Sequence, residues 1–279
     1  MKIILSRKGF DSSNGKQPNP IMPDGTLLSL PIPDKDGNNT FDSLLWDGVS
    51  YYDIISSLKP KTKLQPKDYC HLDPDLRKEL KNRLPGWMPA FGQAGSALTH
   101  LRNHGVTEGD LFLFYGWFKE TEVINGKLVY KKGARDLHVI YAYMQIGEIV
   151  EQMDKAPEWL KDHPHIGDQK VRNDKKNAIF LPTEWLSFMD NIKGCDVLTY
   201  RKDRILTKEG MTRRCWDLPA FFRDVDISNN PNSWKDDYFL SAAIGQEFVI
   251  DATQEIMNWV RKIILLFYLF CKKKNVGVS

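Results

Sequence analysis

Apolar and aromatic residues are concentrated between residues 109 and 149, in short runs separated by polar turns. The run 111–118 is apolar at both odd and even positions, which is typical of a strand that is covered on both faces. An Asn-Gly turn at 125–126 and a further apolar run from residue 138 follow it. The pattern therefore predicts successive antiparallel strands at the centre of the fold.

Shorter apolar segments surround this centre and define the fold class. We predict strands at 3–5, 177–181 and 247–250, and helices at 91–104 and from residue 253 onward. The expected fold is α+β, with a central, mostly antiparallel sheet and flanking helices. A barrel-like closure of the sheet is one option. A chain of 279 residues fits one large domain, which we place at 1–251, followed by a C-terminal helix and basic tail at 252–279.

Composition says more about the location of the protein than about its function. The chain is 42% hydrophobic with a net charge of +3, which by itself does not predict a polyanionic partner. Its four cysteines form no Cys-x-x-Cys pair, so we expect neither a disulfide framework nor a zinc ribbon, and we expect a cytoplasmic location. The N-terminus has only three apolar residues before polarity returns, so we expect no secretory leader.

The apolar run 263–271 near the C-terminus is too short to span a bilayer, which needs about 20 helical residues. We expect no transmembrane segment and interpret the run as the end of a terminal helix with its last turn buried. The alternative is a contact surface for a membrane, a protein partner or a second copy of the chain.

The common enzyme signatures are absent from the sequence. It contains no Walker-type phosphate loop, no dinucleotide fingerprint after a strand, no Gly-x-Ser-x-Gly and no His-Glu-x-x-His. The zinc-deaminase pattern is missing as well. A metal site assembled from distant carboxylates and histidines remains open.

The first polar group of interest follows the first strand, where Arg7, Lys8, Asp11 and Ser12 lie in a Gly- and Ser-rich loop. Loops just beyond a strand end often carry functional groups on a rigid scaffold. A solvated turn with an Arg-Asp pair explains the same residues equally well.

A second group lies at His71 and Asp73. Two residues apart in an extended segment, they would point the same way and could share a metal or a substrate. Alternatively, Asp73 caps a helix that starts at Pro74 and runs to about Leu84. We favour the cap because it also explains the proline.

Two further histidine pairs occur. His163 and His165 flank a proline that should hold the segment extended, and we take them as functional candidates, with structural loop histidines as the alternative. His100 and His104 are one turn apart on a predicted helix; no acidic or cysteine partner is near, so we expect surface residues.

The segments 168–177 and 200–216 are locally basic, and the second is interleaved with aromatics. They would suit a groove that binds phosphates and stacks bases, and Arg201 is our candidate there. A solvated charged surface is the alternative.

Several blocks in order resemble the third of the "nucleotide modification associated domain" families. These blocks are residues 3–12, Pro23-Asp24-Gly25 with residues 29–34, His71-Leu72-Asp73-Pro74-Asp75-Leu76, Phe91-Gly92-Gln93-Ala94-Gly95, residues 109–118 and His163-Pro164-His165. The resemblance extends to about residue 250.

This resemblance implies a bacterial or phage setting and a link, through gene neighbourhood, to the synthesis or use of modified DNA bases. Nucleotide or DNA is therefore the expected partner, and no particular reaction follows. The resemblance favours the polar residues inside the matching blocks, which are Arg7, Asp11, His71, Asp73, Gln93, His163 and His165.

Two hypotheses follow. The first is an enzyme that acts on a nucleotide or on DNA in base modification or phage defence, with a divalent metal as one option for the cofactor. Its catalytic candidates are Asp11, His71, Asp73, His163 and His165, and its substrate-binding candidates are Arg7, Lys8, Ser12, Gln93, Trp117 and Arg201.

The second hypothesis is a non-catalytic reader of modified bases, because the strand pair at 109–149 is similar to that of PUA-like barrels. Trp117, Tyr141 and Tyr143 would then be the stacking candidates. An accessory subunit that binds nucleic acid or positions another enzyme is a third option.

Overall fold

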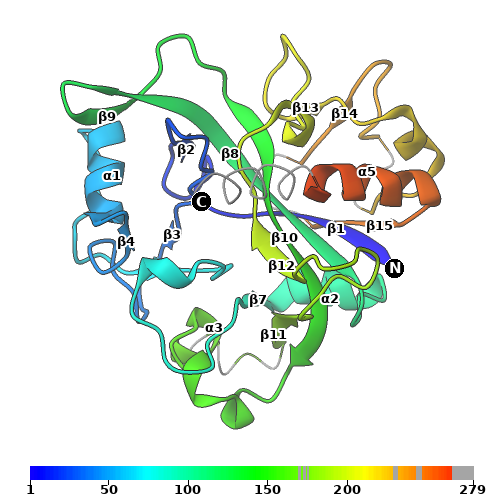
Figure 1. Ribbon diagram of the computed structural model, residues 1–279, viewed down its shortest axis with the longest axis horizontal. Coiled ribbons are helices and arrows are strands. Elements are labelled where there is room, and N and C mark those ends of the chain that lie inside the picture. Colours follow the sequence, from blue (N-terminus) through cyan, green and yellow to red (C-terminus); the bar gives the residue numbers. More distant parts are fainter. Residues whose placement is uncertain (169–170, 172–173, 175, 229–231, 243–246, 266–279) are drawn as a thin grey trace, which may run out of the picture.

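Two long strands, β8 (Leu111–Ile124) and β10 (Leu137–Val150), run through the centre of the computed structural model (Figure 1). They pair antiparallel, from Leu137 opposite Phe118 to Gln145 opposite Leu111. The structure describes residues 1–168, 171, 174, 176–228, 232–242 and 247–265. The predicted central strands are confirmed.

The large sheet has the strand order β15-β1-β8-β10-β11-β7, and β2 and β9 also pair with β8 while β12 pairs with β10. Only the β1–β8 and β2–β8 pairs are parallel within this sheet, so the predicted mostly antiparallel arrangement is confirmed. The bounds of these strands are β1 Lys2–Arg7, β2 Asn19–Ile21, β7 Phe91–Ala94, β9 Lys127–Tyr130, β11 Asn177–Pro182, β12 Cys195–Val197 and β15 Glu247–Asp251.

The sheet curls into a half-barrel, and side chains join its two outer strands. Gln93 Nε2 on β7 donates to Glu247 Oε1 on β15 at 2.6 Å, and Lys8 Nζ lies 3.1 Å from the same oxygen. The Lys8 ammonium also lies 4.5 Å from the centre of the Phe91 ring. Lys8 and Gln93 therefore help to hold the barrel-like curl together.

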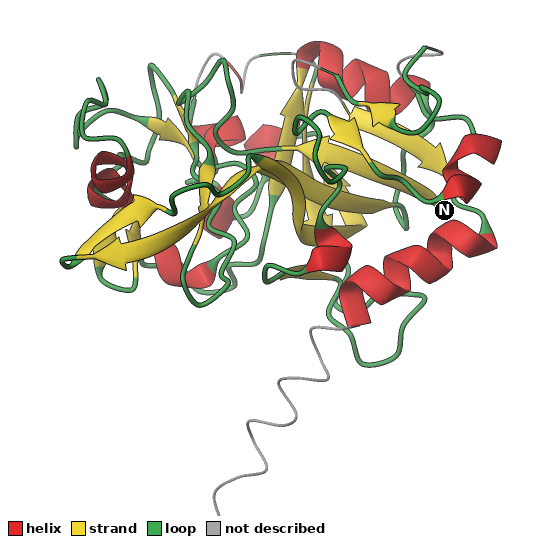
Figure 2. Cartoon of the chain, turned by 90° about the horizontal axis from the view of Figure 1, so that it is seen from above, coloured by secondary structure: helices red, strands yellow, loops and turns green. Residues whose placement is uncertain are grey.

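Two apolar layers pack on the sheet, one against each face. The layer inside the curl is rich in phenylalanine and includes Phe91, Phe112, Phe114 and Phe180, whose rings touch one another. On the other face, helix α5 (Gln254–Leu265) buries Ile256, Val260, Ile263 and Ile264. Figure 2 shows helices on both sides of the strands.

The start of the apolar C-terminal run is thus buried in the core, because Ile263 and Ile264 are almost fully covered. Arg204 reinforces this helix by donating from Nη2 to the Ile263 carbonyl oxygen at 2.9 Å. The rest of the run and the basic tail lie outside the described residues, so the predicted partner contact stays a prediction. In the part of the chain that is described, no helix has the length and apolar character needed to cross a membrane.

A third apolar cluster lies under helix α1 (Tyr51–Leu58), far from α5 in Figure 1. Ser50 caps this helix by accepting from the Asp53 backbone N–H at 3.0 Å. The short strands are β3 Ile32–Pro33, β4 Leu45–Trp46, β5 Val49–Ser50, β6 Cys70–His71, β13 Cys215–Trp216 and β14 Phe239–Leu240. The 3-10 helices are η1 Lys78–Leu80, η2 Met153–Lys155, η3 Glu158–Leu160, η4 Lys202–Arg204 and η5 Ala220–Asp224.

The predicted helix at 91–104 is correct only in its second part. Helix α2 spans Gly95–Asn103, whereas residues 91–94 form β7 and pair with β11. The apolar spacing from Phe91 to Leu101 fits a helix, yet Phe91 packs into the half-barrel while the β7 backbone completes the sheet. Gly95 marks the change of direction, with a φ of 59° that favours glycine.

Candidate metal centre

His71, Asp73 and His165 come together although 94 positions separate His71 from His165 in the sequence. One ligand atom from each lies within 4.8 Å of the other two. His71 ends β6 and Asp73 follows it, whereas His165 belongs to the single-turn helix α3 (Pro164–Gly167). This group and His163 form what we call the histidine–aspartate centre.

His71 is oriented by the strand pair β3–β6 and by a carboxylate. Its backbone pairs opposite Ile32, and its Nδ1 lies 3.1 Å from Asp34 Oδ2. The hydrogen bond to His71 lowers the pKa of Asp34, so the carboxylate is ionised and accepts the Nδ1 hydrogen. The lone pair of His71 is then on Nε2, the arrangement found in carboxylate–histidine–metal sites.

His165 is fixed in the same way by an amide. Its Nδ1 lies 2.7 Å from Asn177 Oδ1, and Asn177 Nδ2 donates to the His165 carbonyl oxygen at 2.8 Å, which defines the orientation of the amide. The remaining Nε2 is 3.9 Å from Asp73 Oδ2. Burial lowers the pKa of His165 to about 4, against the opposing pull of Asp73, so the imidazole is neutral, as a ligand must be.

Gly92 makes room for the His165 ring. A Cβ at this position would lie 2.2 Å from His165 Cδ2, which no real contact allows. Strand β7 can thus support the histidine–aspartate centre only with glycine at position 92.

Asp73 does not cap a helix, so the favoured interpretation of this residue is wrong. The segment after it is extended, because Asp75 and Ala90 exchange two backbone hydrogen bonds of 2.9 and 3.0 Å, and only the 3-10 turn η1 follows. Asp73 Oδ1 instead accepts from the Gly92 backbone N–H at 2.7 Å. Burial opposes ionisation of Asp73, but His163, His165 and His71 hold its pKa well below the ordinary value.

His163 is the fourth member of the centre and caps α3, with the extended backbone that was predicted for it. Pro164 occupies the first helical position, where its fixed φ suits a helix, so the predicted extended turn is wrong only for His165, which lies in α3. His163 Nδ1 accepts from the His165 backbone N–H at 3.3 Å, so its hydrogen is on Nε2. That atom is buried 3.3 Å from Asp73 Oδ1, yet it makes no hydrogen bond of good geometry with any described residue.

Two imidazoles and one carboxylate form a ligand set of recognised chemistry. Catalytic zinc sites use three such ligands and keep a position for water or substrate, and non-haem Fe(II) oxygenases use two histidines and a carboxylate. Ligand bonds of about 2.0–2.2 Å place ligand atoms roughly 3–3.5 Å apart. Side-chain shifts of about 1 Å would therefore close this centre around an ion.

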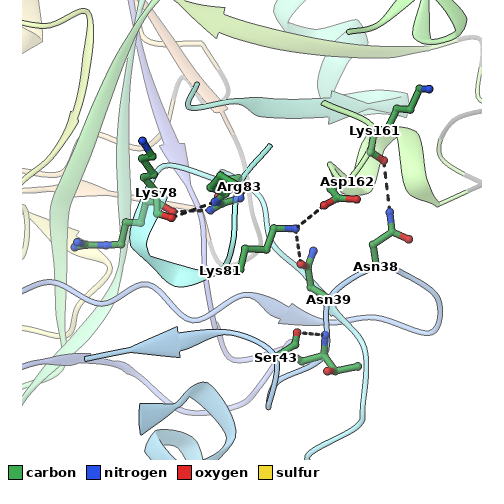
Figure 3. A network of polar contacts seen from close by, with 11 residues as sticks. Asn38, Asn39, Ser43, Lys78, Lys81, Arg83, Lys161 and Asp162 are labelled. Carbon is green, nitrogen blue, oxygen red and sulfur yellow. Dashed lines mark hydrogen bonds and ion pairs between the residues drawn. The ribbon is translucent and has the colours of Figure 1, made fainter. Parts of the chain in front are cut away.

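An open groove of about 870 Å³ is lined in part by Asn38, Asn39, Lys78, Lys81 and Asp162. Lys81 Nζ donates to Asn39 Oδ1 at 2.9 Å and lies 3.4 Å from Asp162 Oδ2, as Figure 3 shows. Asp162 directly precedes His163 in the chain and is the lining residue nearest to the centre in sequence.

The other predicted site residues lie elsewhere. Arg7 and Asp11 form a 3.4 Å ion pair at the end of β1, and β8 and β10 separate that strand from β11, which carries Asn177. Ser12 and Trp117 lie with Arg7, as described below, and Arg201 pairs with Asp203 at 3.3 Å. The basic segment 168–177 falls partly outside the described residues.

Three supporting residues escaped the sequence analysis: Asp34, Gly92 and Asn177. Asp34 and Gly92 lie inside the matching blocks but were not singled out, and Asn177 lies outside these blocks; each acts through a histidine from another segment of the chain. His100 and His104 are not part of the centre: His100 Nε2 contacts Ser228 Oγ at 3.0 Å, and His104 Nδ1 contacts the His100 carbonyl oxygen.

The aromatic candidates for base stacking are mostly buried. Tyr141 and Tyr143 are only 3% and 1% exposed. The Trp117 ring is half-buried and covered by the Arg213 guanidinium, whose carbon lies 4.2 Å from the ring centre. These aromatics are core and support residues, which weakens the reader hypothesis.

The fold and the site together define an α+β protein with a curled half-barrel and a three-ligand centre at one side of it. The family model of nucleotide modification associated domain 3 matches residues 2–251, so the chain belongs to that family. The predicted family is thereby confirmed, and its description is consistent with a role associated with nucleotide modification. The comparisons with curated proteins and with solved structures gave no match.

Proposed function

We propose that this protein is a metal-dependent enzyme that acts on a nucleotide or on DNA in base modification. The observation that carries the proposal is the convergence of His71, Asp73 and His165 within 4.8 Å. Membership of the nucleotide modification family supports the substrate class. A bound divalent ion would supply Lewis-acid chemistry at the open ligand positions.

The supporting contacts favour a metal centre over a structural polar network. Asp34 and Asn177 each take the Nδ1 hydrogen of one histidine and leave Nε2 as the ligand atom. A purely structural network would gain nothing from holding two lone pairs and a carboxylate toward one point.

His163 has a separate role in this proposal. Its Nε2–H lies beside Asp73 but outside the three-ligand group, in a position to exchange a proton with a group bound at the centre. The groove lined by Lys78 and Lys81 would admit a phosphate-bearing substrate to this side of the molecule.

Turnover is the direct test. Purified protein is incubated with nucleotides and with plain or modified DNA, with and without Mn²⁺, Zn²⁺ or Fe(II), and the products are identified by mass spectrometry. We expect turnover that needs one of these metals and that falls at least 100-fold in His163→Ala with the metal retained. Equal turnover in chelated protein would reject the proposal.

A further inference from the structure

A second polar cluster lies at the end of β1, on the face of the sheet that packs against α5. Its members are Arg7, Arg213 and Arg214, which we call the arginine cluster. Arg213 stacks on Trp117 and donates from Nη2 to Ser12 Oγ at 2.8 Å. Burial lowers the pKa of Arg213, Asp136 opposes this change, and Arg7 and Arg214 add to it, so both of these arginines lie near enough to repel Arg213.

The carboxylates near the arginine cluster have other hydrogen-bond partners. Asp11 Oδ1 accepts from the backbone N–H groups of Ser13 and Asn14 at 2.7 and 2.6 Å, and its Oδ2 is 3.4 Å from Arg7. Asp136 Oδ1 accepts from Trp117 Nε1 at 2.8 Å. Asp136 Oδ2 also lies 3.7 Å from Lys119 Nζ, so both carboxylates divide their oxygens between the arginine cluster and other groups.

A buried histidine adds a neutral donor to this region. His138 Nδ1 accepts from Trp216 Nε1 at 2.9 Å, which places the His138 hydrogen on Nε2. His138 is only 1% exposed, and its Nε2 has no hydrogen-bond partner among the described residues. Burial holds the pKa of His138 well below its ordinary value, and the three arginines add to that effect.

The buried Ser241 hydroxyl has no partner in the described part of the chain either. It lies next to Arg214, whose Nε donates to the Ser241 carbonyl oxygen at 3.1 Å. Arginines that repel one another would be stabilised by a bound anion, and the buried donors that lack an acceptor could donate hydrogen bonds to its oxygens.

We propose that the arginine cluster, with His138, binds a phosphate group of the substrate. A guanidinium group can donate two parallel hydrogen bonds to the oxygens of a phosphate, and the buried N–H of His138 can donate to an ionised phosphate oxygen. No residue of the arginine cluster belongs to the histidine–aspartate centre, so the two sites can be altered independently. The assignment of the phosphate to a nucleotide or DNA rests on the proposed function; the binding of phosphate itself does not.

Calorimetric titration with inorganic phosphate, thymidine 5′-monophosphate and a short single-stranded oligonucleotide tests the site. Arg213→Ala should lower the affinity for every probe that the wild-type protein binds by about tenfold or more, and Arg213→Lys should restore only part of that affinity. Arg102→Ala is the matched control, since Arg102 lies on α2 and pairs with Glu151. A mononucleotide that binds as well as the oligonucleotide identifies a nucleotide site, and tighter oligonucleotide binding identifies DNA.

Unchanged binding of every probe in a folded Arg213→Ala variant, or no binding of any probe by the wild-type protein, overturns the phosphate site. The metal centre is tested separately by His165→Ala, which should lose metal and keep phosphate binding. The metal centre and the phosphate site can therefore be confirmed or rejected independently of each other.

Discussion

The histidine–aspartate centre and the arginine cluster lie on the same sheet and are built from opposite chemistry. In the centre, Asp34 and Asn177 bind Nδ1 of His71 and His165, and these two histidines converge with one carboxylate. In the arginine cluster, three guanidinium groups lie near enough to lower the pKa of an imidazole whose buried Nε2 carries a hydrogen. The difference lies in the partner of Nδ1. An acceptor at Nδ1 leaves a lone pair on Nε2, which suits a metal cation, whereas a donor at Nδ1 leaves a hydrogen on Nε2, which suits an anion.

We expect the largest loss of metal affinity when one of the proposed ligands is substituted. His165→Ala and Asp73→Asn should lower metal affinity at least 100-fold, because each removes one of three ligands; Asp73→Asn keeps an oxygen for the Gly92 N–H. Metal affinity is measured by competition with a chelating dye. His104→Ala, an exposed histidine on α2, is the control and should bind metal like the wild type.

Gly92→Ala should have the next largest effect without altering any ligand. The new Cβ would overlap the His165 ring, so the ring must move and metal affinity should fall about 10–100-fold. Dye competition measures the affinity, and circular dichroism confirms that the variant is folded. Wild-type affinity in this variant would mean that the position of His165 does not matter for the ion.

Asp34→Asn and Asn177→Ala test the supporting contacts and should each weaken metal binding by about tenfold. The same titration applies, with Asp24→Asn as control because Asp24 only closes a local turn with Thr26. If either variant matches the control, its side chain has a structural role alone.

The smallest effect concerns His138 and acid stability. Its pKa is well below 6.5 in the folded protein and about 6.5 when unfolded, so the unfolded chain binds more protons below pH 6.5. The free energy of unfolding should therefore fall as the pH decreases below about 6.5. His138→Gln should reduce that slope by up to about 1.4 kcal/mol per pH unit. Urea unfolding at several pH values measures it, and equal slopes would contradict a neutral His138.

The sequence predicted the sheet better than the site. Long apolar runs such as 111–118 leave few alternatives to a covered strand, so β8 and β10 were found without difficulty. Helix 91–104 and the cap at Asp73 failed because short local signals also fit segments whose conformation is set by distant pairing, here of β7 with β11 and of Asp75 with Ala90.

Four of the five catalytic candidates meet at one centre. The sequence could name these residues as candidates but could not predict that they lie together. His71 and Asp73 have a suggestive spacing, but nothing local links them to His165, which approaches through Asn177 and Gly92. Asp11 lies with the arginine cluster instead, where its carboxylate pairs with Arg7.

The metal content of the purified protein tests the central claim most directly. Wild-type protein, loaded with Mn²⁺, Zn²⁺ or Fe(II) and then desalted, is measured by plasma mass spectrometry beside His165→Ala and His104→Ala. We predict close to one equivalent of one metal in the wild type and in His104→Ala, and almost none in His165→Ala. A wild-type protein that retains no metal, or a His165→Ala variant that retains as much, would contradict a metal centre at His71, Asp73 and His165.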